Sequence, residues 1–300
     1  MFFTKGQHFL KTLPDLRADL PFSPEVFQLL FSIDQERSKA SMEALGRVME
    51  RDQGLAVRVL HMANSVYYGL QSQVSSVMRA VLVLGLKEIR KLLLLMSVRQ
   101  LENKLPPNCF DLNAYWQHQV EVAHVAQALA RHSGIEDPEE IFTCGLLHDL
   151  GKLIIVIHHP KHWQGIQNLA ADKNIPVHQA EDVYWGLDHA LIGALTLKYW
   201  FLPTSLTEPI NWHHAPDLAQ EHAMQARVLR LANGLMHMPS EAAQTPVYVG
   251  WEQDLKHLRL APQIPFALAR EVLRDEKPAA FLHGMGIPST RSPLASKLHA

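Results

Sequence analysis

Apolar residues recur at spacings of three and four along most of the chain, and the strict alternation of a half-buried strand is almost absent. This periodicity is typical of amphipathic helices. In the first hundred residues it predicts helices over 24–34, 41–51, 55–64, 77–84 and 86–101. Ser23-Pro24 marks the first start, Ser75 or Ser76 caps the fourth helix, and Gly85 separates the last two. We therefore expect an N-terminal helical bundle.

The segment KLPPNCFDLN, residues 104–113, interrupts this pattern with two prolines and two asparagines. Such a segment predicts a boundary or hinge. Beyond it, helices are expected over 114–133, 139–157, 161–173, 177–185, 188–201, 204–214 and 220–237. The last sixty residues are rich in proline and predict one or two helices, such as 266–274. We expect an all-α protein with two packed bundles, 1–105 and 106–240, and a partly irregular extension, 241–300.

Composition and charge narrow the class of protein. A chain of 300 residues, 47% hydrophobic and 19% charged, can bury a large core, and its net charge of −2 gives no reason to expect nucleic acid or an anionic membrane as a partner. The N-terminus has no signal-peptide pattern, and no uncharged apolar run reaches the roughly 18 residues that span a bilayer. The cysteines, Cys109 and Cys144, form no Cys-x-x-Cys motif, which favours a reducing compartment. We expect a cytoplasmic protein.

Histidine is frequent, with 18 in the chain and many of them between residues 118 and 237. The motif GLLHDLGKL, residues 145–153, sets a histidine and an aspartate side by side in an apolar helical pattern. The candidate metal ligands, one or two on each of several helices, are His118, His148, Asp149, His189, His213 and His214. Imidazole and carboxylate together suit zinc, iron, manganese or nickel. A single histidine on a helix is more often exposed or a hydrogen-bonded core residue, so the prediction depends on the whole set.

The other histidines have plainer interpretations. Those around Pro160, His158, His159 and His162, are assigned to a helix C-terminus, where positive charge suits the helix dipole. The remaining ones treated as structural or exposed are His124, His132, His178, His222 and His237. Lys152 is either a surface lysine or a cation that points at an anion near the metal.

Seven motifs carry a resemblance to a known family. The N-terminal half contains LPFSPEVFQLL, RDQGLAVRVLHMANSVYYGL and SSVMRAVLVLGLKEIRKL, and the second half contains GLLHDLGKL, DHALIGA, WFLP and INWHHAP. Across residues 20–240 the chain therefore resembles the HDOD proteins, which are related to the HD phosphohydrolases and the HD-GYP phosphodiesterases. The resemblance implies an HDOD helical subdomain packed against an HD-like helical bundle, and a role in bacterial-type signal transduction.

The resemblance also implies roles for single residues. His118, His148 and Asp149 match the first positions of the HD metal site. The second-metal histidines of the HD-GYP enzymes are matched by His189, His213 and His214. Lys152 matches the lysine that follows the HD pair, so Asp149 and Lys152 are the candidate catalytic residues if the protein is an enzyme.

Two departures from the HD pattern weigh against catalysis. The pattern ends in a second aspartate, and Asn233 stands at the matching position, where a neutral amide is a weaker ligand and removes a negative charge. The sequence after His213-His214 reads APDLAQ, without the Gly-Tyr-Pro of the HD-GYP enzymes. Asp188 could supply a substitute carboxylate, but aspartate at that position more often begins a helix.

Three functions stay open from the sequence. The first is a regulatory HDOD protein with a retained, non-catalytic metal site. The site would hold one divalent ion, Fe, Mn, Zn or Ni, rather than two. The protein would act by contacting an unidentified signalling protein. It could also bind a small phosphate-containing ligand. The alternative is a metal-dependent phosphohydrolase for nucleotides or cyclic dinucleotides, with Lys152 steadying the phosphate. The third is a structural fold without metal.

Overall fold

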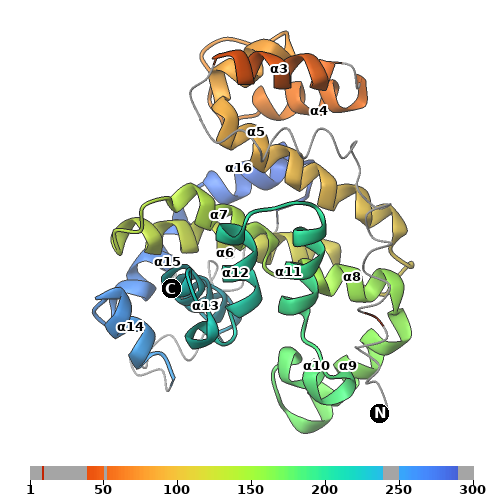
Figure 1. The fold of residues 1–300 in the computed structure, drawn as a ribbon, viewed down its shortest axis with the longest axis vertical. Coiled ribbons are helices and arrows are strands. Elements are labelled where there is room, and N and C mark those ends of the chain that lie inside the picture. The colour runs from red at the N-terminus through yellow and green to blue at the C-terminus, as the bar shows by residue number, and fades with distance from the viewer. Residues whose placement is uncertain (1–8, 10–38, 51–52, 239–249, 290–300) are drawn as a thin grey trace.

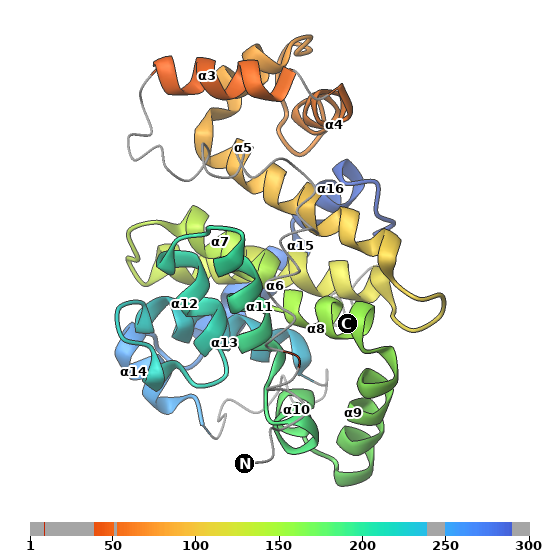
Figure 2. The same cartoon turned by 45° about the vertical axis from the view of Figure 1, so that its right-hand side comes forward.

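The structure is a computed structural model that describes residue 9 and residues 39–50, 53–238 and 250–289. Within these ranges the chain forms helices and connecting segments, with no strand, which confirms the predicted all-α class. The predicted helix over 24–34 lies outside the described residues. Figure 1 shows a central group of helices with α3 and α4 at one end and α9 and α10 at the other, and Figure 2 shows the same order after rotation.

The N-terminal helices are α3 (Lys39–Glu50), α4 (Gln53–Ala63) and the long α5 (Val77–Leu101). Ser76 caps α5 as expected, because its side chain accepts a hydrogen bond from the backbone N–H of Arg79. Gly85, at φ 79° and ψ 167°, interrupts α5 where the sequence predicted a break. This conformation is open to glycine and strained for other residues, so the two halves of α5 point in different directions.

The connection to the central helices runs through a short 3₁₀ turn, η2 (Glu102–Lys104), and ends at α6 (Leu112–His132). Asp111 caps α6 by accepting from the backbone N–H of Ala114 at 2.9 Å. Trp116 on α6 is fully buried, and its indole N–H donates to Glu102 at 2.6 Å. This bond ties the end of the N-terminal helices to the middle of the protein.

One helix was predicted over 139–157, and the structure divides it into α7 (Pro138–Leu147) and α8 (Leu150–His158). The break falls on His148 and Asp149, where Asp149 adopts φ −99° and ψ 11°. Tertiary contacts on both sides explain it. A Cβ on Gly145 would lie 2.5 Å from the Cα of Ala123 on α6, and one on Gly151 would overlap the backbone carbonyl of His189. The two glycines thus let α7 and α8 each approach a different helix.

The remaining central helices follow the predicted order with shifted ends. They are α9 (Pro160–Lys173), α10 (Val177–Trp185), α11 (His189–Tyr199), α12 (Thr204–Trp212), the 3₁₀ turn η3 (Pro216–Leu218) and α13 (Ala223–His237). The predicted start of the last helix at 220 is wrong, because the Glu208 carboxylate accepts the backbone N–H groups of residues 220–222 and holds them outside the helix. The assignment of His162 to a helix C-terminus is also wrong, since it lies in the first turn of α9.

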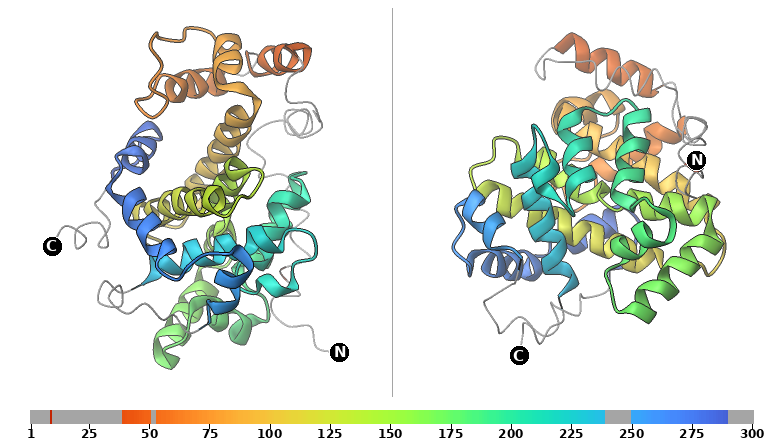
Figure 3. Two further views of the ribbon diagram at one scale, coloured as in Figure 1. Left: turned by 90° about the vertical axis from the view of Figure 1, so that its left-hand side faces the viewer. Right: turned by 60° about the horizontal axis from the view of Figure 1, so that its bottom comes forward.

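The C-terminal part contains α14 (Glu252–Leu258), α15 (Ile264–Arg274) and α16 (Lys277–Gly284), where the sequence predicted one or two helices. These helices run along one side of the central group, and α16 reaches the level of α5 (Figure 3). Arg227 on α13 donates to Asp254 on α14 at 2.7 Å, and the ring of Trp251 lies where a side chain on Gly234 would be. Of the C-terminal helices, α14 and α15 therefore pack against α13, and α15 and α16 pack against α6.

Among the described residues, only the stretch Pro138–His158 is long and apolar enough to cross a membrane by composition. It consists of α7 and α8, and 83% of its most apolar window is buried inside the protein. Its apolar surface is therefore already covered by neighbouring helices.

Candidate metal centre

All six side chains predicted as ligands come together between the central helices. His118 lies in the middle of α6, His148 and Asp149 lie at the break between α7 and α8, and His189 is the first residue of α11. His213 and His214 follow the end of α12. Two groups of three have ligand atoms within 4.8 Å of one another: His118, His148 and Asp149 form one, and His189, His213 and His214 form the other.

Asp149 joins the two groups. Its Oδ2 lies 3.4 Å from Nε2 of His148 and 3.6 Å from Nε2 of His118. Its Oδ1 lies 3.0 Å from Nε2 of His189 in the other group. The helix break explains this reach, because Asp149 sits outside both helices and directs one carboxylate oxygen to each side.

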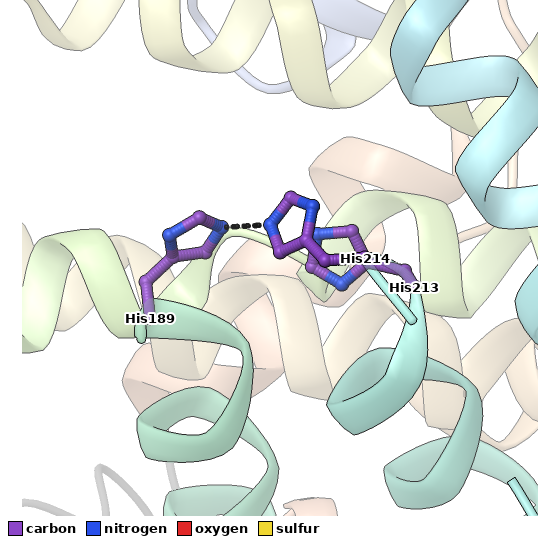
Figure 4. Close-up of side chains that lie close together, drawn as sticks. All are labelled: His189, His213 and His214. Atoms are coloured by element: carbon purple, nitrogen blue, oxygen red, sulfur yellow. Dashed lines mark hydrogen bonds between the residues drawn. The ribbon is translucent and has the colours of Figure 1, made fainter. Parts of the chain in front are cut away.

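The second group places two imidazole nitrogens face to face. Nε2 of His189 and Nε2 of His214 are 3.0 Å apart, as the dashed line in Figure 4 shows. The ring of His213 lies beside that of His214, with centroids 3.8 Å apart. Two ring nitrogens at this distance need a shared proton or a cation between them, since two lone pairs repel. A proton on His189 or a bound cation would satisfy this pair.

Hydrogen bonds orient the deeply buried histidines. Nδ1 of His148 donates to the carbonyl of Gly145 at 2.8 Å, and Nδ1 of His213 donates to the carbonyl of Ile210 at 2.7 Å. The Nε2 atoms of His118, His148 and His213 are buried and have no hydrogen-bond partner among the described residues. Metal-binding histidines characteristically donate from one nitrogen and leave the other free for the ion. The donor set thus fits a divalent transition metal.

Glu181 is a site residue that the sequence analysis missed. It lies on α10, is fully buried, and its Oε2 accepts from Nδ1 of His189 at 2.7 Å. The same oxygen accepts the backbone N–H of His189 at 2.8 Å. A weak signal was present in the sequence, because Glu181 stands four residues before Trp185 and shares the buried face of that helix.

Burial and neighbouring charges set the protonation of the site. Burial lowers the pKa of His148 to about 4, and it also lowers the pKa of His118, His213 and His214. Burial opposes the charge of Asp149, but His148 and Lys152 hold the pKa of this carboxyl well below its ordinary value. Burial likewise opposes protonation of His189, yet Glu181 and Asp149 raise its pKa to about 9. Near neutral pH Asp149 is ionised and four of the five histidines are neutral, as metal binding requires, whereas His189 would release its proton when an ion binds.

Lys152 lies one turn beyond Asp149, and its Nζ contacts Oδ2 of that residue at 2.6 Å. Asn233 on α13 is buried, and its Oδ1 has no hydrogen-bond partner within the described ranges. Asp188 caps α11 by accepting from the backbone N–H of Leu191 at 2.9 Å, as the sequence analysis favoured. It is therefore engaged as a helix cap and not as a substitute ligand.

Two histidines interpreted as structural or exposed lie against the site. His237 stacks on His118 with ring centroids 4.5 Å apart, and His178 stacks on His214 at 3.9 Å. Burial lowers the pKa of both. Sequence periodicity had no means of finding these contacts, because each pair joins two different helices.

A cavity of about 500 Å³ opens onto one side of the site. Its walls include His118, Asp149, Lys152 and His237, together with aromatic residues such as Trp163. A small molecule in this cavity would be in contact with the first group of candidate ligands.

A family model for the HDOD domain matches residues 20–216, which is more than half of the chain. The chain belongs to the HDOD domain family. Among curated proteins, this HDOD chain is 24% identical over 200 residues to an uncharacterized protein of Treponema pallidum (strain Nichols). The match covers 66% of this chain and 38% of that protein, so the chain spans less than half the length of the curated relative it matches.

Solved structures with the same fold include an HDOD domain protein of unknown function from Geobacter sulfurreducens. It is 22% identical, has a TM-score of 0.69, and the match covers 91% of this chain and 97% of that one. A protein of Shewanella amazonensis SB2B, provisionally named a phosphohydrolase, is 26% identical with a TM-score of 0.67. That match covers 92% of this chain and 98% of the other. The match to these solved structures thus extends beyond the residues that the family model covers.

Proposed function

We propose that this HDOD chain is a regulatory signalling protein whose central helices hold one divalent transition metal, Fe, Mn, Zn or Ni. The observation that carries the proposal is that Asp149 joins two groups of candidate ligands, in which the Nε2 atoms of His118, His148 and His213 are buried without a hydrogen-bond partner in the described part of the chain. Unpaired buried polar atoms cost free energy, and a bound cation would satisfy them.

The charges of the site favour one ion over two. Asp149 and Glu181 are its acidic groups, and Lys152 pairs directly with Asp149. With His189 deprotonated to bind an ion, these three groups carry a single net negative charge. One divalent ion brings the site close to neutrality, whereas two would leave a large uncompensated charge in a buried region.

The same groups favour a non-catalytic role. Lys152 occupies the carboxylate oxygen of Asp149 that faces His118 and His148. The position of the second HD aspartate is Asn233, and the segment after His214 lacks Gly-Tyr-Pro. We propose that the output is instead a contact with a cytoplasmic signalling protein through the N-terminal helices. We also propose that the chain divides into an N-terminal HDOD subdomain, 1–105, an HD-like helical subdomain, 106–240, and a C-terminal extension, 241–300.

Metal content tests the first part of the proposal. Protein purified without a chelator and without an affinity metal is expected to contain about one equivalent of Fe, Mn, Zn or Ni by elemental analysis. The H148A/H213A variant removes one ligand from each group and should contain none, while melting as a folded protein. Metal-free wild-type protein that also fails to bind any of the four ions in titration would contradict the proposal.

A second function is favoured by the cavity beside Asp149 and Lys152, which would admit a phosphate-containing ligand to the site. In that case the chain would hydrolyse nucleoside phosphates or cyclic dinucleotides, with Lys152 binding the phosphate and the metal acting as Lewis acid. The S. amazonensis neighbour carries such a name. Turnover with Mn, Fe, Ni or Zn that D149A abolishes would establish the enzyme. Inactivity with all four metals would leave the regulatory role.

A further inference from the structure

The local structure does not require a buried carboxylate at the position of Glu181. This carboxylate has no exposed surface, and one oxygen accepts both the backbone N–H and the ring Nδ1 of His189. The other oxygen, Oε1, is buried without a hydrogen-bond partner among the described residues. Burying a carboxylate in this state is unfavourable unless a positive charge compensates it.

Glu181 is not needed to begin α11. Asp188 already caps that helix through the backbone N–H of Leu191. A neutral group would also suffice to orient the ring, because His148 and His213 donate from Nδ1 to backbone carbonyls in the same site. His189 alone among these three is oriented by a charged acceptor. The difference between a carbonyl and a carboxylate is a negative charge, which makes the imidazole a stronger donor to a cation.

The negative charge of Glu181 lies in a site where a carboxylate is missing at another position. Asp149 is the one carboxylate among the six candidate ligands, and the second HD aspartate is replaced by Asn233. Glu181 lies on the far side of His189 from Asp149, which contacts Nε2 of the same ring. Each ring nitrogen of His189 therefore contacts one carboxylate, Nδ1 that of Glu181 and Nε2 that of Asp149.

We propose that Glu181 is a positioning residue of the metal centre, which fixes His189 with Nε2 directed at the ion and supplies, through that ring, the negative charge absent at Asn233. This inference rests on the proposed metal centre. It identifies the residue that supplies a negative charge to a site holding one ion. Glu181 does not contact the ion itself.

Titration with Co²⁺, followed by its visible absorption, tests the assignment on the full-length chain. E181Q keeps the size and an acceptor oxygen and removes only the charge, whereas E181A also removes the acceptor. Both are expected to weaken Co²⁺ binding by about 10- to 100-fold, with E181A the weaker binder. E181D, which restores the charge on a shorter side chain, should recover part of the affinity. In protein loaded with diamagnetic Zn²⁺, the ¹⁵N shifts of His189 should report a protonated Nδ1 and a ligating Nε2 in wild type, and the loss of this state in E181A.

D188N is the matched control, because it makes the same acid-to-amide change at the start of α11 and keeps the helix cap. It should bind Co²⁺ as wild type does. If E181Q and E181A bind Co²⁺ as tightly as wild type, the proposed role of Glu181 is wrong, while the proposed metal centre stands. If wild type itself binds no Co²⁺, both the metal centre and this assignment fail. E181Q is nearly isosteric, so it keeps the test valid if E181A does not fold.

Discussion

At the scale of single residues, the motif GLLHDLGKL has two kinds of members. His148 and Asp149 carry the candidate chemistry, and Gly145 and Gly151 allow the backbone contacts that place them. The glycines lie on opposite sides of the helix break, against α6 and α11. The geometry of the metal centre therefore depends on residues without side chains as much as on its ligands.

The first prediction concerns Gly151. G151A would place a Cβ against the backbone carbonyl of His189, which cannot move like a flexible side chain. We expect a loss of about 3 kcal/mol of stability in urea denaturation and weaker Co²⁺ binding. G46A is the control, since its new Cβ would meet the flexible end of Met78, 2.8 Å away. Equal stability of G151A and G46A would argue against the tight approach of α8 and α11.

The second prediction concerns pH and His124, which lies outside the metal centre. Burial lowers the pKa of His124 to about 4, so the unfolded chain binds a proton that the folded chain does not. The stability of the protein should therefore fall as the pH drops from about 6.5 to about 4. Over this pH range the free energy of unfolding of H124L should fall by up to about 3 kcal/mol less than that of wild type. Urea denaturation at each pH measures this difference. Parallel curves for the two proteins would exclude this cause.

At the scale of elements, most helices were predictable because their signals are local. Ser76, Asp111 and Asp188 each cap a helix with a side-chain oxygen, and the apolar periodicity between caps identifies the buried face. The division of 139–157 into two helices was not predictable, because it depends on Ala123 and His189, which are far away in the chain. The start of α13 was missed for the same reason, through Glu208.

The third prediction belongs to α5. G85A introduces a side chain at φ 79° and ψ 167°, with nothing within 4 Å for it to strike, so its cost is backbone strain alone. We expect a loss of about 1–3 kcal/mol of stability. S76A, which removes the cap of the same helix, should cost about 1 kcal/mol for comparison. A G85A variant as stable as wild type in urea would show that the break in α5 is not required.

At the scale of the whole molecule, the metal centre collects side chains from α6 and α11 and from the ends of α7, α8 and α12, and α10 contributes Glu181. Two of the C-terminal helices, α14 and α15, pack against α13, which carries Asn233 and His237. Arg227 links these parts, because it pairs with Asp254 on α14 and with Asp217 in η3. The C-terminal helices thus support the wall of the central group.

The fourth prediction follows from this link. D254A leaves Arg227 without its buried partner and should cost about 2 kcal/mol of stability, since Asp217 still pairs with the guanidinium. Limited proteolysis with trypsin should cleave the D254A protein at Lys256 in α14 faster than wild type. D254N keeps an acceptor oxygen and should show a smaller effect. Identical proteolysis of all three proteins would contradict a stabilising role for the pair.

The sequence by itself determined the helical class, most helix boundaries and the residue types of a metal site, because periodicity, capping and composition depend on near neighbours in the chain. It also carried the motifs of the HDOD family. Only the tertiary structure decided that the candidate ligands form two groups joined by Asp149, that Glu181 faces His189, and that His178 and His237 stack on the site. These contacts join residues on different helices, and packing, which sets the distances between helices, is not encoded in any single segment.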